Sequence, residues 1–396
     1  MASGGNFELL CLENPLLDIQ GKGTPELLEK YGMKPNDAIL AEEKHMGLYE
    51  DLLQNHDAKI IAGGAAQNTA RGAQRPLLHD WCLIAYPMLT PPVHPPPNSV
   101  LYIGCVGRDS YAEKLQAACA EAGVRVEYRY DDEQPTGRCG VIITGHDRSM
   151  CTDLAAANCY KLEHLKQPEI WKLVEQAKVY YVGGYHLTVC VPAVMALAEE
   201  AAAKNKVRRI RNSNPHLTEL SQIAEVKRLT PHTPDLRPSL SAPFIPQFFK
   251  EQLDQTAPYW DYVIGNETEA ASYAESHGLP KDDLTAIAKA MACLPKKNTA
   301  RPRTVIITQG TDPTIVAIGK GDGEVEVKTF DVHAIGEEQI NDTNGAGDAF
   351  AGGFMAGVVQ GKPLETCVDM GHWLAKLSIQ ELGPSYPTPK QTYTHS

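Results

Sequence analysis

The feature of this sequence that most constrains its fold is the alternation of short apolar runs with helical patterns along most of the chain. The apolar runs are uninterrupted and rich in β-branched residues, which is typical of strands buried on both faces of a parallel sheet. They are Phe7–Leu12, Ser99–Val106, Val179–Gly183, Tyr262–Gly265 and Thr304–Gln309. The helical patterns between them include Tyr111–Ala122, Pro192–Lys204, Pro246–Leu253, Glu267–His277 and Asp283–Ala292. The alternation predicts an α/β fold whose ligands bind at the carboxyl ends of the strands.

One region departs from this alternation. Tyr128–Thr144 alternates polar and apolar residues around a turn sequence at Gln134–Gly137. Such alternation is typical of an antiparallel element with one solvated face. We therefore expect a small antiparallel flap over one edge of the sheet.

Composition excludes several classes of function. The 37 basic and 49 acidic residues give a net charge of −12, whereas nucleic acids and anionic lipids attract basic surfaces. No apolar run reaches the ~18 residues of a membrane span, and the N-terminus does not resemble a signal peptide. The ten cysteines contain no Cys-x-x-Cys pair and predict reduced thiols. We expect a cytoplasmic protein without nucleic-acid or membrane partners; nuclear presence is left open.

The strongest chemical signal is the thirteen-residue string Asn341–Gly353, which is rich in glycine and leads into a helical pattern. The backbone N–H groups of Gly345, Ala346 and Gly347 would point at an anion, helped by the positive end of the helix dipole. The carboxylate of Asp348 would accept a proton from a hydroxyl held beside that anion. A glycine-rich turn with an acidic helix cap is the structural alternative. The whole string favours phosphoryl transfer to an alcohol.

This string resembles the C-terminal signature of the ribokinase-like (PfkB) carbohydrate and nucleoside kinases. Ala62–Asn68 is similar to the family's Gly-Gly motif before a helix, which implies that Gly63 and Gly64 approach the sugar. Asn266–Glu269 is similar to the Asn-x-x-Glu motif, which implies a magnesium ion held near Asn266 and Glu269, through water. The resemblance implies a three-layer α/β/α fold with a central, mostly parallel sheet and a small β lid. It also implies ATP and Mg²⁺ as the cofactors.

Within the family, Asn14–Asp18 resembles the opening motif of the members that phosphorylate adenosine. This resemblance implies transfer from ATP to the 5′-hydroxyl of adenosine, giving AMP and ADP in purine salvage. Two vicinal hydroxyl groups can both donate to one carboxylate, which explains Asp18 in physical terms. Asp348 would be the general base, and Arg148 would neutralise charge on the phosphoryl group as the flap closes. The implied substrate residues are Asn14, Leu16, Asp18, Gly63, Gly64, Asn68, Cys139, His186, Phe244 and Asn344.

Two of these expectations carry alternatives. Some relatives have an aromatic pair where this chain has Tyr185 and His186, so the imidazole of His186 would stack on the purine with less area. Thr308 and Gly310 end a strand where the family places its nucleotide loop. His372 would lie near the ATP base, although a lone helical histidine is as readily a buried structural residue.

Two segments do not fit the family pattern. Residues 75–95 are rich in proline and follow a helix pattern, and residues 208–239 are basic within an acidic chain. Our hypothesis is that both are translated introns or another gene-model error, because the second interrupts what should be a buried strand. The competing interpretation is a genuine insertion that forms surface loops. We expect one kinase domain over residues 1–390, with lid segments at about 18–62 and 124–158.

Three other functions remain to be weighed. A sugar kinase or another nucleoside kinase of the same family would share the fold, but Asn14–Asp18 and Gln134–Gly137 favour the nucleoside. A non-catalytic protein disabled by the two segments would be expected to lack the base or the anion loop, and both are present. A Rossmann dehydrogenase is disfavoured because no Gly-x-Gly-x-x-Gly follows an early strand. Adenosine and ATP are the expected partners, and we expect a monomer.

Overall fold

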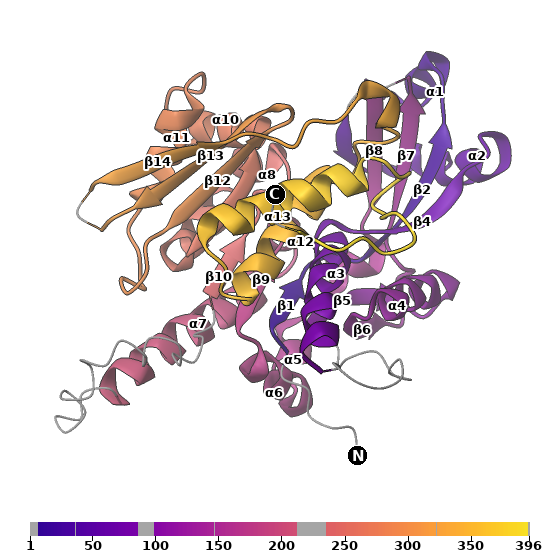
Figure 1. Cartoon of the computed structure of the whole chain (residues 1–396). Helices are drawn as coiled ribbons and strands as arrows, with labels where there is room; N and C mark the ends of the chain where they lie inside the picture. The colour runs from indigo at the N-terminus through magenta and orange to yellow at the C-terminus, as the bar shows by residue number, and fades with distance from the viewer. Residues whose placement is uncertain are drawn as a thin grey trace.

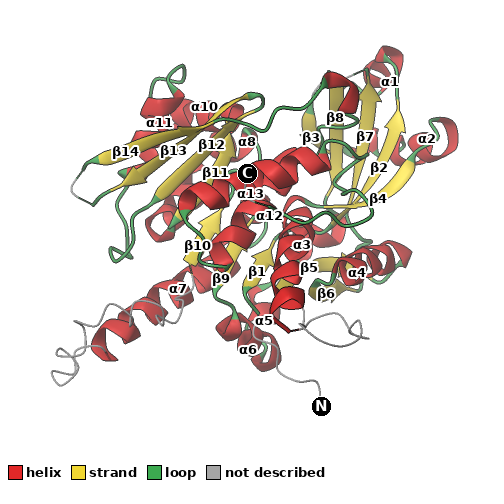
Figure 2. Ribbon diagram, viewed as in Figure 1, coloured by secondary structure: helices red, strands yellow, loops and turns green. Residues whose placement is uncertain are grey.

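The computed structural model describes residues 7–35, 37–85, 99–145, 147–211, 235–321 and 323–394. In this part of the chain the strands form a main sheet built from two segments and a smaller, separate lid sheet (Figures 1 and 2). Strands of the main sheet lie between helices on both faces, as Figure 2 shows. The prediction of a three-layer α/β/α fold with a β lid is confirmed.

The first segment of the main sheet is entirely parallel, with the strand order β10-β9-β1-β5-β6. Its central strand β1 aligns Leu9 with Val100 on one side and with Val179 on the other. The strands are β1 (Leu9–Leu12), β5 (Val100–Gly107), β6 (Arg125–Asp131), β9 (Val179–Val182) and β10 (Asp235–Pro238).

The second segment has the order β11-β12-β13-β14 and is joined to the first by a parallel bridge between Ser239 and Ile264. The first two strands, β11 and β12, are parallel to each other, whereas β13 and β14 each pair in antiparallel fashion. The main sheet as a whole is therefore mostly parallel. The strands are β11 (Tyr262–Asn266), β12 (Thr304–Gln309), β13 (Asp312–Gly319) and β14 (Val325–Phe330).

Alternate residues of each central strand enter two different cores, which is why the strands read as continuous apolar runs. Leu9 and Cys11 pack with Ala70 and Phe354 on one face, while Leu10 packs in the cluster on the other face. The helices are α3 (Ala65–Ala85), α4 (Ser110–Ala122), α5 (Leu162–Leu165), α6 (Pro168–Gln176), α7 (Val191–Arg211), α8 (Phe244–Phe248), α9 (Lys250–Thr256), α10 (Glu267–Ser276), α11 (Leu284–Ala292), α12 (Ala346–Val359) and α13 (Leu364–Ser378). The single helix expected over Pro246–Leu253 is instead two short ones that meet at Phe249.

The lid is a separate sheet with the order β3-β8-β7-β2-β4. Its apolar face packs against two short helices through residues such as Ile19, Leu52 and Ile142. The elements are β2 (Leu16–Lys22), α1 (Pro25–Lys30), β3 (Ala38–Leu40), α2 (Leu48–Asn55), β4 (Lys59–Gly63), β7 (Arg138–Thr144) and β8 (Asp147–Asp153). Figure 1 shows the lid beside the carboxyl ends of the main-sheet strands.

The lid corrects the expectation of an antiparallel flap over Tyr128–Thr144. β6 pairs in parallel with β5 in the main sheet, whereas β7 pairs with β8 and β2 in the lid. Gln134–Gly137 therefore crosses from one sheet to the other instead of turning a hairpin. The alternation in β6 has a physical cause, because an edge strand has one partner and one partly solvated face.

The two segments suspected of being insertions are described only in part. Residues 75–85 continue helix α3 through Pro76, and residues 208–211 continue helix α7. Neither segment was expected to form a long strand or helix, so these helical extensions differ from the prediction. Residues 235–238 of the second segment form strand β10, which pairs with β9 in the main sheet and also differs from the prediction. Residues 86–98 and 212–234 lie outside the described residues, and the translated-intron hypothesis remains a prediction.

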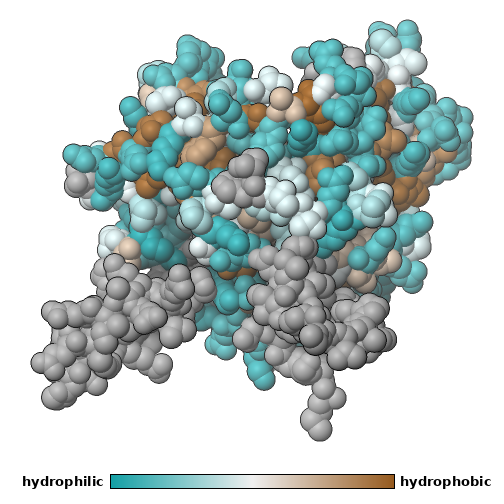
Figure 3. Space-filling model, in the orientation of Figure 1, coloured by the Kyte–Doolittle hydropathy of each residue, from teal (hydrophilic) through white to brown (hydrophobic). Residues whose placement is uncertain are grey.

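Three further observations concern the surface, the helices and the cysteines of the described residues. Hydrophobic residues lie among hydrophilic ones over the lid in Figure 3. Leu40 and Ile60 are exposed lid residues. Among the described residues, no helix combines the length and the apolar character that a bilayer crossing requires. The nine described cysteines are free thiols.

Candidate active site

A cavity of about 380 Å³ lies between the lid and the carboxyl ends of the main-sheet strands. Its wall from the main domain carries Asn14 after β1, Tyr185 after β9 and Glu269 after β11. The lid contributes residues of β2, β3, β7 and β8. The loop before α12 contributes Thr343–Gly345, and the first turn of α12 contributes Ala346, Gly347 and Asp348. The cavity thus lies where ligands of parallel α/β sheets bind.

The loop before α12 has the geometry of an anion-binding turn. Gly345 has a φ of +80°, and a Cβ there would lie 2.7 Å from Pro384, so only glycine fits. A Cβ on Gly347 would meet nothing within 4 Å, which leaves open space above the first turn of the helix. The Ala346 N–H already donates to Thr343 O at 3.2 Å. The expected cradle of three amides therefore rests mainly on Gly345 and Gly347, together with the helix dipole.

The Asp348 carboxylate stands in the first turn of α12, beside this open space. Asn68 on α3 donates from Nδ2 to Asp348 Oδ2 at 3.0 Å. Burial raises the pKa of Asp348 to about 7, and the hydrogen bond from Asn68 partly opposes that increase. A carboxylate with a pKa near neutrality is suited to general-base chemistry. Asn68, predicted to bind substrate, orients Asp348 and also lines the cavity.

The two N-terminal motifs meet at the cavity, because the Gly-Gly pair leaves room for the Asn14–Asp18 segment. A Cβ on Gly63 would lie 2.3 Å from Asp18 Oδ1, and one on Gly64 would lie 2.7 Å from Asn14 O. Asn14, Asp18 and Gly64 line the cavity, while Gly63 acts one step behind Asp18. Small residues are thus required here for close packing.

Four acidic side chains share this cavity: Glu13, Asp18, Glu269 and Asp348. Burial, reinforced by the charge of Asp348, raises the pKa of Glu13 to about 8 and that of Asp18 to about 7. The pKa of Glu269 is also raised to about 7, mainly by burial. Such a group of carboxyls favours a ligand whose hydroxyl groups donate hydrogen bonds. If the ligand carries phosphates, the carboxyls favour a cation bound together with them.

The lid side chain Arg148 reaches the cavity and forms an ion pair that links the lid to the anion loop. Its Nε donates to Asp342 Oδ1 at 3.0 Å. The same carboxylate accepts from Gln20 Nε2 at 2.7 Å and from the N–H groups of Asn344 and Gly383, each at 2.9 Å. Asp342 thereby joins two lid strands, the anion loop and the C-terminal segment.

Part of the cavity wall is apolar. Leu16, Cys139 and Phe244 line the cavity as predicted, together with Ile39, Leu40, Met150 and Tyr185. The ring of Tyr185 lies 5.8 Å from that of Phe244. Asn344 also lines the cavity. A planar aromatic base would find aliphatic and aromatic surface among these side chains.

His186 does not lie where the prediction put it. Its side chain is fully buried and packs edge-on against the ring of Tyr160, with centroids 5.1 Å apart. Its Nδ1 lies 3.2 Å from Asn14 Oδ1. Tyr185, one position earlier, is the aromatic residue that faces the cavity. The neighbouring side chain therefore replaces His186 as the candidate for stacking.

The residues expected to bind nucleotide and metal are divided between the cavity and its margin. Asn266 and Glu269 form a capping box at the start of α10, with Asn266 N donating to Glu269 Oε2 at 3.0 Å. Thr308 pairs with Asn266 across β11 and β12, and Gly310 takes a φ of +58° in the following turn. His372 on α13 is buried, with Nε2 2.8 Å from Thr314 Oγ1. Of these, Glu269 lines the cavity described above.

A magnesium ion bound directly by protein carboxylates does not fit this arrangement. Both oxygens of Glu269 already accept hydrogen bonds from Asn266. Within the described residues, no cluster of three or more His, Cys, Asp or Glu side chains is arranged to hold a metal. Magnesium commonly keeps several waters and binds substrate phosphates. The carboxylate of Glu269 at the cavity wall fits an ion held through such water.

Three residues of the site were missed at the sequence level. Glu13 directly precedes the Asn14 motif, and its Oε2 accepts from Ala66 N at 2.7 Å. Tyr185 was seen only as the partner of His186, and Asp342 was read only as part of the glycine-rich string. For Glu13 and Asp342 a signal existed, since each lies within or beside a recognised motif.

The fold, with a lid beside a cavity at the carboxyl ends of its parallel strands, is that of a phosphotransferase. A family model for the pfkB family of carbohydrate kinases matches residues 25–237 and 213–391. The chain therefore belongs to the pfkB family.

Within that family, the chain is similar over nearly its whole length to proteins named adenosine kinase. The Schizosaccharomyces pombe protein of that name is 43% identical over 390 residues, covering 98% of each chain. Adenosine kinase 1 of Arabidopsis thaliana is 41% identical over 379 residues, covering 96% of each. The crystal structure of Anopheles gambiae adenosine kinase in complex with P1,P4-di(adenosine-5) tetraphosphate has a TM-score of 0.81 and 38% identity, covering 96% of this chain and 98% of that one. The Schistosoma mansoni enzyme in complex with adenosine and AMP has a TM-score of 0.76 and 31% identity, covering 96% and 97%.

Proposed function

We propose that this chain transfers the γ-phosphoryl group of ATP to the 5′-hydroxyl of adenosine, giving AMP and ADP. The observation that carries the proposal is the position of Asp348 beside the anion loop, in a cavity lined by both polar and apolar side chains. Full-length relatives named adenosine kinase support the choice of substrate. The structure of one relative in complex with adenosine and AMP is consistent with it.

In the proposed mechanism, Asp348 accepts the proton of the 5′-hydroxyl while the oxygen of that hydroxyl attacks the γ-phosphorus of ATP. The bond between the γ-phosphorus and its bridging oxygen breaks, and ADP leaves with the electron pair. Asn68 holds Asp348 Oδ2, so the second carboxylate oxygen is the one available to the hydroxyl. Asp348 must be ionised to act, and its raised pKa of about 7 leaves that form well populated near neutral pH.

Charge on the transferring phosphoryl group is stabilised by the Gly345 and Gly347 amides and by the dipole of α12. Arg148 supplies a full positive charge from the lid, and Asp342 holds its guanidinium at the cavity wall. A lid residue of this kind links the charge stabilisation to the exclusion of water.

The proposed substrate contacts follow from the cavity wall. Asn14 and Asp18 bind the ribose hydroxyls, while Leu16, Cys139, Tyr185 and Phe244 surround the base. ATP would lie on the side of Glu269, Thr308, Gly310 and His372. Magnesium, when bound with ATP, would offset phosphate charge there, with Glu269 holding it through water and Asn266 orienting Glu269.

We also propose that one chain suffices and that it acts in the cytoplasm. The main sheet, the lid and the anion loop of a single chain supply all the cavity residues named above. The free thiols of the described residues are typical of a reducing compartment. The reaction would return free adenosine to the nucleotide pool.

The test is a phosphorylation assay of the purified full chain with ATP and magnesium chloride. Adenosine, inosine, ribose and fructose are offered separately, and the phosphorylated products are separated by chromatography. We expect AMP from adenosine, with far lower turnover on the other three. Folded protein that makes no AMP would falsify the proposal, and faster turnover of ribose or fructose would replace it with a sugar kinase.

A further inference from the structure

The side chain of Asn14 is held from behind by His186. Asn14 Oδ1 lies 3.2 Å from Nδ1 of the imidazole ring, and both side chains are almost completely buried. An amide oxygen can only accept a hydrogen bond. Nδ1 of His186 must therefore carry the proton, and the carboxamide of Asn14 is fixed at its oxygen end.

The other end of the carboxamide has no partner. Asn14 Nδ2 is buried, makes no hydrogen bond within the described residues and belongs to a side chain that lines the cavity. A buried donor without an acceptor is costly, so it points to a ligand that supplies one. The unpartnered group is an N–H₂ donor and not a carbonyl acceptor.

The electrostatics of the cavity favour this orientation over the reverse one. Glu13, Asp18 and Asp348 line the same cavity. A carbonyl of Asn14 turned toward them would add another negative dipole, whereas an N–H₂ group offsets their charge. The reversed amide would also require His186 to protonate Nε2, which has no hydrogen-bond partner among the described residues.

His186 itself is held in one state. The ring of Tyr160 packs edge-on against it at an interplanar angle of 66°. Burial lowers the pKa of His186 to about 3, so the imidazole remains neutral at any working pH. A neutral ring with a fixed proton on Nδ1 is a constant donor to Asn14.

We propose that His186 is a positioning residue that fixes the Asn14 carboxamide so that its N–H₂ group donates to a ribose hydroxyl, whose own proton is accepted by Asp18. This inference rests on the proposed function and specifies the direction of its sugar contacts. A hydroxyl that accepts from one residue and donates to another forms a polarised chain, which is stronger than two separate bonds. A deoxyribose that lacks this hydroxyl would leave both the Asn14 amide and the Asp18 carboxylate unpaired.

The first experiment compares His186→Phe, which removes the donor, with His186→Asn, whose Nδ2 takes nearly the position of the imidazole Nδ1. Losing the contact that orients Asn14 should raise KM for adenosine about tenfold, corresponding to one buried hydrogen bond. KM for ATP and kcat should change by less than about twofold, because neither depends on the sugar contact. His186→Asn should restore most of the loss in KM.

Two further variants separate positioning from a general structural effect. In an Asn14→Ala background, His186→Phe should add nothing to KM, because the group it positions is gone. His164→Phe is the matched control, because His164 also packs against Tyr160 but makes no hydrogen bond to Asn14 in the structure. It should leave KM for adenosine unchanged.

The outcomes are distinguishable. Wild-type protein that makes no AMP overturns the proposed function and this inference with it. Active wild type with an unchanged KM in His186→Phe, or an equal effect of that change in the Asn14→Ala background, overturns the inference alone. Should His186→Phe not fold, Asn14→Asp tests the same point, because it keeps the contact with His186 but replaces the donor by an acceptor. An Asn14→Asp variant with wild-type KM would likewise overturn it.

Discussion

Buried polar clusters lie at both ends of the strand pair β11 and β12. They differ in how completely their polar groups are hydrogen-bonded within the protein. Asp261 and Arg303 immediately precede β11 and β12, at their amino ends. Asn266 and Thr308 lie at the carboxyl ends of the same strands, next to the cavity. Both ends belong to the same paired strands and the same hydrophobic core. The difference between the clusters therefore reflects a structural role at one end and a binding role at the other.

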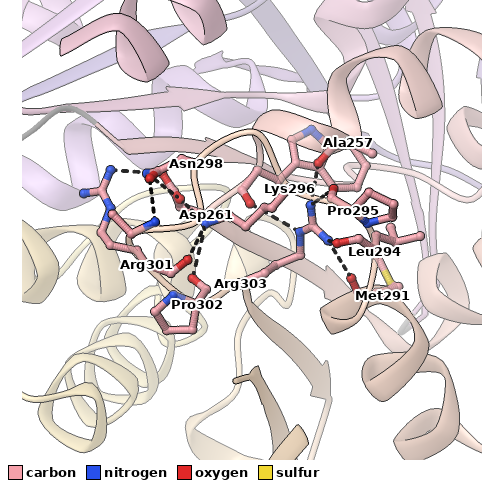
Figure 4. Close-up of polar contacts among 12 residues, drawn as sticks. Ala257, Asp261, Met291, Leu294, Pro295, Lys296, Asn298, Arg301, Pro302 and Arg303 are labelled. Atoms are coloured by element: carbon pink, nitrogen blue, oxygen red, sulfur yellow. Dashed lines mark hydrogen bonds and ion pairs between the residues drawn. The ribbon is translucent and has the colours of Figure 1, made fainter. Parts of the chain in front are cut away.

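At the amino end the polar groups are paired within the protein (Figure 4). Arg303 is 1% exposed and donates to five carbonyl oxygens, those of Ala257, Trp260, Met291, Leu294 and Pro295. Asp261 accepts from Lys296 and from Arg301, the latter at 3.2 Å. Strands, loops and the end of α11 are thereby held together by one internal network.

In the cavity beside the carboxyl ends, which residues that follow β1 or lie on α3 also line, the pairing is incomplete. Glu13 Oε1, Asn14 Nδ2 and Asn68 Oδ1 have no hydrogen-bond partner within the described residues. The pKa values of Asp18, Glu269 and Asp348 are all raised to about 7, mainly by burial. Buried groups that lack partners weaken the free protein and become useful when a ligand supplies them. Of these two clusters, the one around Arg303 is structural, whereas the one with unpaired groups lines the candidate site.

The largest expected effect is at the incomplete end. Asp348→Asn keeps the size and the contact with Asn68 but cannot accept the substrate proton. We expect kcat to fall by about 10²–10⁴-fold, the usual contribution of a general base, while adenosine binding measured by calorimetry stays within about threefold. Asp312→Asn, at an exposed position at the start of β13, is the control. Unchanged turnover in Asp348→Asn would remove this residue from the mechanism.

The next effect is on stability and concerns the satisfied end. Arg303→Met leaves five carbonyl groups without their shared donor in a buried position. We expect the free energy of unfolding, measured by urea titration, to fall by about 3–5 kcal/mol. The KM of the remaining folded protein should not change. Lys320→Met, an exposed neighbour, should stay within about 0.5 kcal/mol of wild type.

These two ends were not equally predictable from the sequence. Asp348 could be predicted because its loop, helix start and carboxylate are contiguous, and a short segment specifies its own local geometry. The role of Arg303 could not, because its acceptors are backbone carbonyls that only tertiary packing brings together. No residue pattern encodes such a contact.

The same limit explains the two errors of detail. The polar–apolar alternation of β6 predicted a hairpin, but an edge strand of a parallel sheet alternates in the same way. Which of Tyr185 and His186 faces the cavity depends on a turn of 3₁₀ helix over Gly184–Thr188. Adjacent residues in such a turn point in different directions, and the sequence does not fix which one points inward.

A smaller effect is expected where the lid meets the anion loop. Arg148→Gln keeps a polar side chain but removes the charge that Asp342 holds at the cavity wall. We expect kcat to fall by about 100-fold, the lower limit for loss of one charge-stabilising donor, with KM for adenosine little changed. Arg138→Gln is the matched control, because Arg138 pairs with Asp153 on the lid and packs over Tyr49. Equal losses in both variants would indicate lid stability instead of charge stabilisation.

The smallest effect links the carboxyl cluster to pH. The pKa values of Asp18, Glu269 and Asp348 are about 7 in the folded chain and about 4 when unfolded. Between these values the folded chain binds more protons than the unfolded chain, so its stability must fall as pH rises. The contribution is complete below pH 4 and is lost through pH 7.

Asp348→Asn removes one of these carboxyls, so the loss of stability between pH 4 and pH 8 should be smaller in the variant. The side chain faces the cavity, where water moderates the cost of its charge, so we expect a difference of about 1 kcal/mol at pH 8. Urea titrations of both proteins at several pH values measure it, with Asp312→Asn expected to follow wild type. Parallel pH profiles for wild type and Asp348→Asn would show that this carboxyl is not under electrostatic strain. The contrast between the two ends of β11 and β12 would then rest on hydrogen bonding alone.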